Sequence, residues 1–225
     1  MSAIQGIQLN KSYRHFQVLK NVSFEVAPGE CYALFGPNGA GKTTLLKVLA
    51  TLQKPSSGRF EIMGYDGIQD RNQVRAILLM IAHGSYLYSE LDAVENLRFA
   101  MGLRGFSPTA REVKLALDRA GIGAFADFKI RYFSEGMKKR LSIAKAMLIR
   151  PKVLLMDEPY SSLDERGIAM MNHFIRESLE QGSAILMTTH NRVQSAEVAG
   201  KAGVLHQGVL REIAVKDLVA AHELF

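Results

Sequence analysis

The sequence predicts an α/β fold with a largely parallel central sheet, an antiparallel β subdomain near the N-terminus and an inserted α-helical subdomain. Before about residue 84 and after about residue 150, apolar strand-like runs alternate with helix-like segments. Between these limits the chain reads as helices joined by loops. Hydrophobic residues make up 48% of the 225 residues and charged residues 22%, which is ordinary for a folded protein. We therefore expect one domain over residues 1–225, with a helical insertion at about 84–150.

The first elements follow from hydrophobic patterning and turn signals. Two segments near the N-terminus alternate apolar and polar residues, as half-buried antiparallel strands do. A third is continuously apolar, which favours a buried central strand. The expected elements are strands at Ile4–Leu9, Val22–Val26, Cys31–Phe35 and Arg59–Met63 and a helix at Lys42–Leu52.

The helical insertion is followed by a return to the α/β pattern. Its last helix has apolar residues at helical spacing on one face. The expected helices of the insertion are Asp92–Leu103, Pro108–Ala120 and Met137–Arg150. After them we expect a strand at Val153–Met156, a helix at Glu165–Gln181, a strand at Ala184–Thr188, and a closing short strand and helix.

Composition excludes several classes of protein. The longest uninterrupted apolar run is Ala76–Ala82, far below the ~20 residues that span a bilayer. The first residues contain no signal-peptide core, so we expect a cytoplasmic protein. Cys31 is the only cysteine, so an intrachain disulfide is ruled out.

The net charge of +6 raises the question of an anionic partner. The densest basic cluster is Lys138–Arg140, with Lys145, Arg150 and Lys152 nearby. We interpret this cluster as a solvated helix face, with a nucleic-acid patch as the alternative. No nucleic acid is expected as a partner.

A glycine-rich loop between the strand Cys31–Phe35 and the next helix matches the phosphate-binding pattern G-x-x-x-x-G-K-[ST]. Glycines let several backbone N–H groups point at one phosphate, and the helix N-terminus adds positive potential. Lys42 would contact the β- and γ-phosphates, and Thr43 would offer a hydroxyl to Mg²⁺. A plain glycine-rich turn would not explain the lysine and the two threonines. The candidate nucleotide-binding residues are Gly36, Pro37, Asn38, Gly39, Ala40, Gly41, Lys42, Thr43 and Thr44.

Two acidic residues, Asp157 and Glu158, directly follow the expected strand Val153–Met156. Carboxylates at the end of a buried strand are costly unless a cation lies there. We expect Asp157 to hold Mg²⁺ together with Thr43, and Glu158 to orient or deprotonate an attacking water. A helix N-cap is the alternative for this acidic pair.

With both motifs in place, the chain resembles the ATP-binding cassette (ABC) ATPases over nearly its whole length. The resemblance implies a P-loop NTPase fold with a RecA-like core, ATP as the nucleotide and Mg²⁺ as its cofactor. It also identifies a signature loop, Phe133–Met137, as the counterpart of the usual Leu-Ser-Gly-Gly-Gln pattern. The loop keeps the serine (Ser134) and the second glycine (Gly136) but has Glu135 and Met137 instead of the first glycine and the glutamine. Ser134, Glu135 and Gly136 are then expected at the γ-phosphate held by an opposite protomer, with the Glu135 side chain pointing away. A helix N-cap is the alternative for Ser134.

The resemblance assigns further residues. Ser162 and Asp164 belong to the counterpart of the family's D-loop, which crosses the dimer interface. His190 follows a strand where the family has a histidine that senses the γ-phosphate, although a lone histidine there is often structural. Tyr13 is expected to stack on adenine, with a surface or core aromatic as the alternative.

One position departs from the family pattern. The glutamine that normally ends the strand before the helical insertion is absent, and His83 or Gly84 takes its place. The segments His83–Leu91 and Glu95–Phe99 are similar to the ATPase subunit of the haem exporters of cytochrome c maturation.

These observations lead to one functional prediction and its alternatives. We expect the ATP-hydrolysing subunit of an ABC membrane transporter, an exporter with haem as a candidate cargo, located at the cytoplasmic face of the cell membrane. Its partners would be a second cassette, identical or related, and integral membrane permease subunits. The alternatives are an exporter of drugs, lipids or polysaccharides, a non-transport ABC ATPase, and a nucleotide-binding regulator with little turnover.

Overall fold

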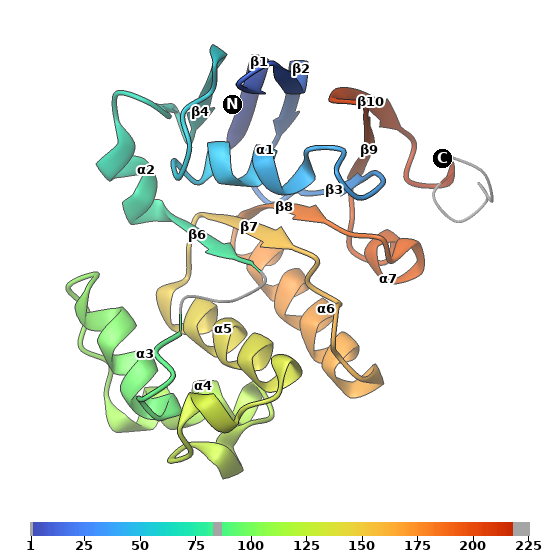
Figure 1. Cartoon of the computed structure of the whole chain (residues 1–225). Coiled ribbons are helices and arrows are strands. Elements are labelled where there is room, and N and C mark those ends of the chain that lie inside the picture. Colours follow the sequence, from blue (N-terminus) through green and yellow to red (C-terminus); the bar gives the residue numbers. More distant parts are fainter. Residues whose placement is uncertain (1, 83–86, 218–225) are drawn as a thin grey trace. The chain divides into compact units, whose positions relative to one another are not determined.

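The computed structural model describes residues 2–82 and 87–217. The chain divides into two compact units (Figure 1). The first comprises Met1–Met80, Pro151–Pro159 and Ile175–Phe225, and the second comprises Ile81–Arg150 and Tyr160–Phe174. The second unit therefore takes up residues 160–174 in addition to the segment that we expected as an insertion.

Two sheets form the β structure, and they confirm the predicted α/β fold. A four-stranded antiparallel sheet has the strand order β2-β1-β4-β5, and a six-stranded sheet has the order β10-β9-β3-β8-β7-β6. Strand β3 pairs in parallel with β8 and β9, and β7 pairs in parallel with β8. The strands are β1 (Ile4–Tyr13), β2 (Phe16–Val26), β3 (Cys31–Phe35), β4 (Ser57–Ile62), β5 (Tyr65–Asp66), β6 (Leu78–Ile81), β7 (Val153–Asp157), β8 (Ala184–Thr188), β9 (Lys201–His206) and β10 (Val209–Ile213).

Two helices of the second unit begin at capping boxes. Asp92 and Thr109 each form a capping box with the glutamate three residues later, which satisfies backbone N–H groups at the starts of α3 and α4. The α-helices are α1 (Lys42–Leu49), α2 (Arg71–Ile77), α3 (Ala93–Gly102), α4 (Ala110–Arg119), α5 (Glu135–Ile149), α6 (Glu165–Glu180) and α7 (Arg192–Ala196). Short 3₁₀ turns lie at Gly123–Phe125 and Ile130–Tyr132.

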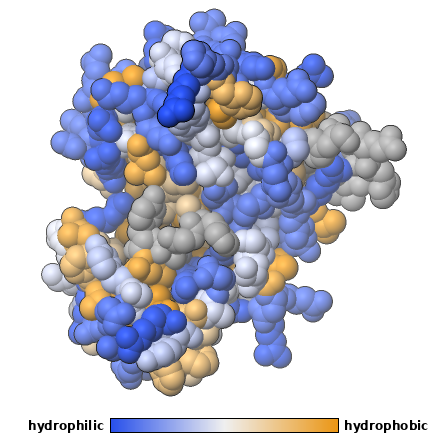
Figure 2. Space-filling view, viewed as in Figure 1, coloured by the Kyte–Doolittle hydropathy of each residue, from blue (hydrophilic) through white to orange (hydrophobic). Residues whose placement is uncertain are grey.

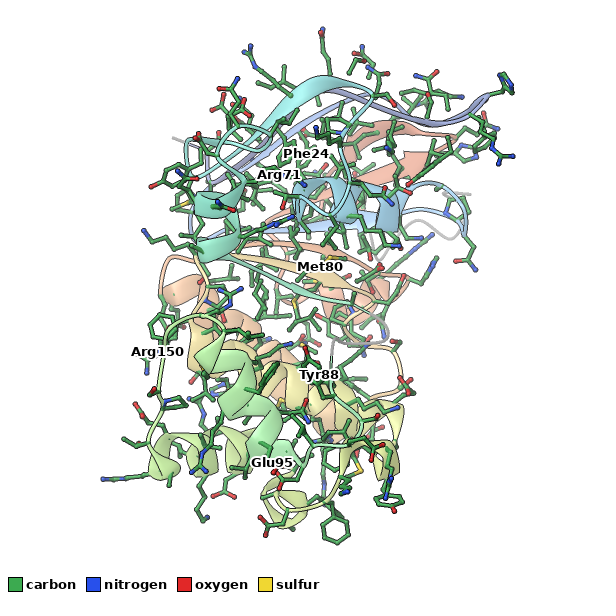
Figure 3. All side chains as sticks on the ribbon, turned by 60° about the vertical axis from the view of Figure 1, so that its left-hand side comes forward. Phe24, Arg71, Met80, Tyr88, Glu95 and Arg150 are labelled. Atoms are coloured by element: carbon green, nitrogen blue, oxygen red, sulfur yellow. The ribbon has the colours of Figure 1, made fainter. Side chains whose placement is uncertain are left out.

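The core of the first unit lies around α1, which Figure 1 shows between the antiparallel sheet and strands β3, β8 and β7. Leu45, Leu46 and Leu49 of α1 are buried in one cluster with residues of both sheets. Phe24, labelled in Figure 3, reaches from β2 into this cluster, where its ring centroid lies 5.9 Å from that of Tyr32. Burial of α1 on both sides fixes the loop that precedes it.

The helical unit has a separate core. Leu97 of α3, Leu117 of α4 and Leu141 of α5 belong to one buried cluster. Asn96 is buried among them and holds the preceding loop, because its side chain donates to the carbonyls of Tyr88 and Leu91 and accepts from the N–H of Tyr88. Tyr88, labelled in Figure 3, also contacts Phe99 edge to face at 4.7 Å between ring centroids.

The closing elements differ from the expectation of one strand and one helix. The structure has the short helix α7, followed by a hairpin of β9 and β10. The expected last helix was given no bounds, and residues 218–225 lie outside the described part of the chain. Figure 2 shows hydrophilic residues over much of the face in view, with apolar residues between them. Among the described residues no helix is long and apolar enough to cross a membrane.

Candidate functional site

The loop between β3 and α1 depends on glycine at two positions. Gly36 and Gly41 have φ values of 150° and 107°, which other residues rarely adopt. A Cβ atom at Gly36 would lie 2.2 Å from the carbonyl oxygen of Leu205, and one at Gly41 would lie 3.0 Å from that of Val18. The glycines therefore let the loop pass directly over the neighbouring backbone.

The start of α1 is open to an anion. Its N-cap is Gly41, which has no side chain to accept a hydrogen bond from the first turn. The first turn also contains no acidic residue. The N–H groups and the positive end of the helix are therefore directed at whatever occupies the loop, which favours phosphate.

Lys42 is folded back onto the loop. Only 7% of the residue is exposed, and its Nζ donates to the carbonyl oxygens of Gly36 at 2.6 Å and Pro37 at 3.3 Å. Burial lowers the pKa of Lys42, and the negative charges of Glu158 and Asp157 partly oppose this effect. The ammonium group is thus held at the mouth of the loop by weak neutral acceptors that a phosphate can replace.

Asp157, at the end of β7, lies between two hydroxyl groups. Its Oδ2 accepts from Thr43 Oγ1 at 2.8 Å and its Oδ1 accepts from Thr188 Oγ1 at 2.5 Å. Asp157 and Thr188 are register partners at the same end of the parallel strands β7 and β8. The sequence reasoning missed Thr188, although its place at the end of the neighbouring buried strand could have indicated it.

Thr43 and Asp157 suit a magnesium ion bound together with phosphates. Both offer hard oxygen atoms, and these lie side by side. Within residues 2–82 and 87–217, no group of three or more histidine, cysteine or acidic residues could hold a metal. A metal at this place would therefore take its remaining ligands from a phosphate and from water, as Mg²⁺ commonly does.

Glu158 and His190 lie next to this pair. Glu158 has a φ of 48°, an unusual conformation for a residue with a side chain. Its Oε2 accepts from the backbone N–H of His190 at 3.2 Å. The Nε2 of His190 lies 3.3 Å from Glu158 Oε1 and 3.3 Å from Lys42 Nζ. The residues expected to act on a γ-phosphate are therefore gathered around Lys42.

Tyr13, the residue expected to stack on adenine, does not line the hollow beside the phosphate-binding loop. It is 44% exposed, its hydroxyl is hydrogen-bonded to Gln53, and Lys11 Nζ lies 5.1 Å from its ring centroid. A hollow of about 250 Å³ adjoins Gly39 and Ala40, and the aromatic residue that lines it is Phe16 rather than Tyr13. Phe16 was not among the sequence candidates, and its 69% exposure is hard to infer from hydropathy.

The other candidates belong to the helical unit. Ser134 is the N-cap of α5 and accepts from the N–H of Met137 at 3.2 Å, which agrees with the alternative considered for it. Glu135 forms an ion pair with Lys138 at 2.8 Å, so its charge is compensated locally. Gly136 and Ser162 approach each other closely, and Asp164 is bound by Arg140.

The basic run Lys138–Arg140 is less exposed than the sequence suggests. Its interpretation as a solvated helix face was wrong for two of its three residues. Lys139 is 6% exposed and the Arg140 side chain 17%, because both find partners in the loop before α6. His83 and Gly84, the replacements for the missing glutamine, lie outside the described residues.

Comparison with known proteins identifies what this chain resembles. A family model described as ABC transporter matches residues 19–161. The uncharacterized ABC transporter ATP-binding protein YxlF of Bacillus subtilis (strain 168) is 38% identical over 89% of the chain, which spans 66% of that protein's length. The cytochrome c biogenesis ATP-binding export protein CcmA of Pseudomonas putida (strain GB-1) is 32% identical over 84% of the chain and 89% of its own length.

A solved structure gives the same indication. The ATP-binding subunit of an ABC transporter superposes with a TM-score of 0.88 at 28% identity, and the match covers 96% of this chain and 91% of that one. The likeness extends over both units of the chain.

Proposed function

Because the chain belongs to the ABC transporter family of ATP-binding proteins, we propose that it is the ATP-hydrolysing subunit of a membrane exporter. Membership of this family implies ATP binding and hydrolysis. The coupling of hydrolysis to export is the part that we propose. The observation that best supports hydrolysis is that Asp157, Glu158 and His190 gather around Lys42 and Thr43 at the start of α1.

The phosphates would occupy the loop between β3 and α1. Backbone N–H groups at the start of α1 would hold the β-phosphate, and Lys42 would leave its carbonyl acceptors to contact the β- and γ-phosphates. Thr43 and Asp157 would hold Mg²⁺. When bound, the ion neutralises the phosphate charge that develops as the bond to the γ-phosphoryl group breaks.

Glu158 is the proposed general base. A water attacks the γ-phosphorus and loses its proton to the Glu158 carboxylate, while the bond from phosphorus to the β–γ bridging oxygen breaks. The products are ADP and inorganic phosphate. His190 is within reach of both Glu158 and Lys42, so it can align the water and the γ-phosphate.

Ser134 and Gly136 are proposed to complete the site of a second copy. A serine at the N-terminus of the long helix α5 offers a hydroxyl and backbone N–H groups to a phosphate. The ion pair of Glu135 with Lys138 supports this role, because it removes the local excess of negative charge that would repel the nucleotide. Each chain would then supply a phosphate-binding loop to one site and a signature loop to the other, with Ser162 and Asp164 at the interface.

The more specific part of the proposal is that the transporter is an exporter and that its cargo is haem. It is supported by the similarity to the P. putida cytochrome c biogenesis export protein, which covers both units. The chain would bind integral permease subunits at the cytoplasmic face of the membrane. His83 or Gly84 would take the place of the family's glutamine.

The decisive test of hydrolysis is Glu158→Gln. The amide keeps the shape of the side chain but accepts a proton poorly, so ATP binding should persist while the hydrolysis rate falls at least about 100-fold. Glu180→Gln, an exposed glutamate at the end of α6, is the control and should behave like the parent. Hydrolysis by Glu158→Gln at the parental rate would refute the assignment of the base.

The test of transport uses the same variant as a trap. Tagged Glu158→Gln with ATP would be purified from gently solubilised native membranes, and the associated proteins identified. We expect multi-spanning membrane proteins, together with haem or cytochrome c assembly proteins if the cargo assignment is right. Recovery of permeases without haem or cytochrome c assembly proteins would refute haem as the cargo and support export of another compound. Recovery of ribosomes or DNA alone would contradict the transporter proposal.

A further inference from the structure

Two residues of the basic run, Lys139 and Arg140, make contacts that the hydrolysis mechanism does not use. Lys139 and Arg140 follow the signature loop within the first two turns of α5. Both side chains are directed at the loop before α6, and neither belongs to the apolar cluster that holds the helical unit together. All of these residues belong to the same unit.

Lys139 provides the first connection. It is 6% exposed, and its Nζ donates to Ser161 Oγ at 2.6 Å. A buried ammonium group is costly unless it is hydrogen-bonded, so this contact is well defined. It joins the second turn of α5 to the first residue of the segment 161–164.

Arg140 provides the second connection. Its Nη2 lies 2.7 Å from Asp164 Oδ1, and its Nη1 donates to the carbonyl oxygen of Ala120 at 3.3 Å. Asp164 Oδ1 also accepts from the N–H of Gly167 at 2.9 Å, at the start of α6. The Gly167 N–H, and then the Arg140 guanidinium, lower the pKa of Asp164, so this carboxyl group is ionised at neutral pH. The guanidinium therefore links α4, α5 and the start of α6.

Gly136 allows the two loops to touch. A Cβ atom at this position would lie 2.6 Å from the carbonyl oxygen of Ser162, so only glycine permits the approach. Ser162 has a φ of 63°, an unfavourable conformation that persists only where its surroundings impose it. The segment 161–164 is thus fixed at both ends by α5 and contacts the signature loop in its middle.

We propose that Lys139 and Arg140 are positioning residues that fix the loop 161–164 against α5, so that the signature loop and this loop meet a second copy as one rigid element. The inference rests on the proposed function, in which Ser134 and Gly136 act on nucleotide held by that second copy. It assigns Lys139 and Arg140 neither to solvent nor to nucleic acid. Loss of either connection should affect the step that needs two copies and not the binding of ATP to one.

The test compares binding with turnover. Arg140→Gln and Lys139→Gln should bind ATP as the parent does, because their contacts lie outside the phosphate-binding loop. ATP-dependent dimerisation and kcat should fall by about three- to thirtyfold, the range expected when a coupling contact is lost. Arg140→Lys, which keeps the charge, should recover part of the loss. Arg140→Gln combined with Asp164→Asn should be no worse than Asp164→Asn alone, because the two act through one pair.

Lys114→Gln is the matched control. Lys114 and Asp118 form an ion pair of the same 2.7 Å length in the same unit, but on an exposed surface, so kcat and dimerisation should be unchanged. Melting temperatures show whether each variant is folded; if Arg140→Gln is not, Lys139→Gln and Ser161→Ala provide the test.

The outcomes separate the two proposals. If the parent neither binds nor hydrolyses ATP, the proposed function fails. If the parent is active and the folded Arg140→Gln and Lys139→Gln variants match it in kcat and dimerisation, the positioning role is refuted and the function stands. An equal loss in Lys114→Gln would also refute it, because the effect would then not be specific to these contacts.

Discussion

At the scale of single residues, Tyr32 presents an unusual feature. It lies fully buried on the central strand β3, and within the described part of the chain its hydroxyl has no hydrogen-bond partner. Burial, and then the nearby charges of Glu212 and Glu30, raise the pKa of this phenol, so the hydroxyl stays neutral. A buried polar group without a partner costs stability, and the ring, rather than the hydroxyl, makes the favourable contact with Phe24.

Tyr32→Phe should therefore leave the free energy of unfolding unchanged or raise it by up to about 1 kcal/mol. Tyr160→Phe is the contrasting variant, because the Tyr160 hydroxyl donates to Asn172 Oδ1 at 2.7 Å in a buried setting. Its removal should cost about 1–2 kcal/mol, because a buried hydrogen bond is lost. Urea unfolding of both variants measures the difference. A loss in Tyr32→Phe as large as that in Tyr160→Phe would mean that the Tyr32 hydroxyl does have a partner.

Residue types with a single chemical purpose were the easiest to predict from sequence. Lys42, Thr43 and Asp157 were identified because a lysine, a hydroxyl and a carboxylate next to a glycine loop are typical of phosphate binding, and the structure brings them together. Phe16 was missed because nothing in the sequence distinguishes a surface aromatic from one that lines a hollow. Lys139 was misjudged, because hydropathy assigns lysine to solvent and Ser161 is far away in the sequence.

At the scale of elements, the start of α4 shows how local sequence fixes a boundary. Thr109 accepts from the N–H of Glu112 at 3.2 Å, and Glu112 Oε2 accepts from the N–H of Thr109 at 2.7 Å. The helix was expected from Pro108 and begins at Ala110, one residue after this cap. The sequence pattern located the helix, and the Thr109 cap, which was not predicted, sets where it begins.

Thr109→Ala should lower the free energy of unfolding by about 1 kcal/mol, because the cap of α4 is lost. Ser107→Ala is the control, since Ser107 is exposed and lies outside the cap. Circular dichroism during denaturation measures both variants. Equal stability of Thr109→Ala and the parent would show that the cap does not contribute.

The same cap predicts a pH dependence. Hydrogen bonds from the Thr109 backbone N–H and then its hydroxyl lower the pKa of Glu112 below its ordinary value of 4.5. The stabilisation is therefore complete above the unfolded-state pKa and is lost as the pH falls through the lower, folded-state pKa. Between about pH 5.5 and about pH 3, the free energy of unfolding should fall less steeply in Glu112→Gln than in the parent. Identical slopes in acid titrations of stability would contradict this assignment.

Other elements could not be located as well. Strand β1 was expected to end at Leu9 but continues to Tyr13, because register shifts beyond Gly6 keep it paired with β2 where the alternation is lost. The helix α2 and the two-residue strand β5 were not expected, since short elements leave little periodicity to detect. Helix α5 begins at Glu135, two residues before its predicted start, because the N-cap Ser134 rather than the first apolar residue sets the boundary.

At the scale of the whole molecule, the two-unit organisation has a consequence for assembly. The phosphate-binding loop, Asp157, Glu158 and His190 belong to one unit, and Ser134, Gly136 and the loop 161–164 belong to the other. In the proposed pairing, every complete site combines the first set from one chain with the second set from another. A variant in the first set therefore damages the site that holds nucleotide on its own chain. A variant in the second set damages the site that holds nucleotide on the partner chain.

Mixing two inactive variants tests this directly. Lys42→Ala should lose nucleotide binding and Ser134→Ala should lose hydrolysis, so each alone should be inactive. In a mixed pair, the Ser134→Ala chain still supplies an intact phosphate-binding loop and the Lys42→Ala chain an intact signature loop, which makes one complete site. Random pairing of equal amounts forms mixed pairs half of the time, each with one of two sites, so ATPase activity should return to about a quarter of the parental value. Two differently tagged Lys42→Ala preparations are the control and should stay inactive on mixing. If the mixture of unlike variants is as inactive as this control, each chain completes its own site and head-to-tail pairing is wrong.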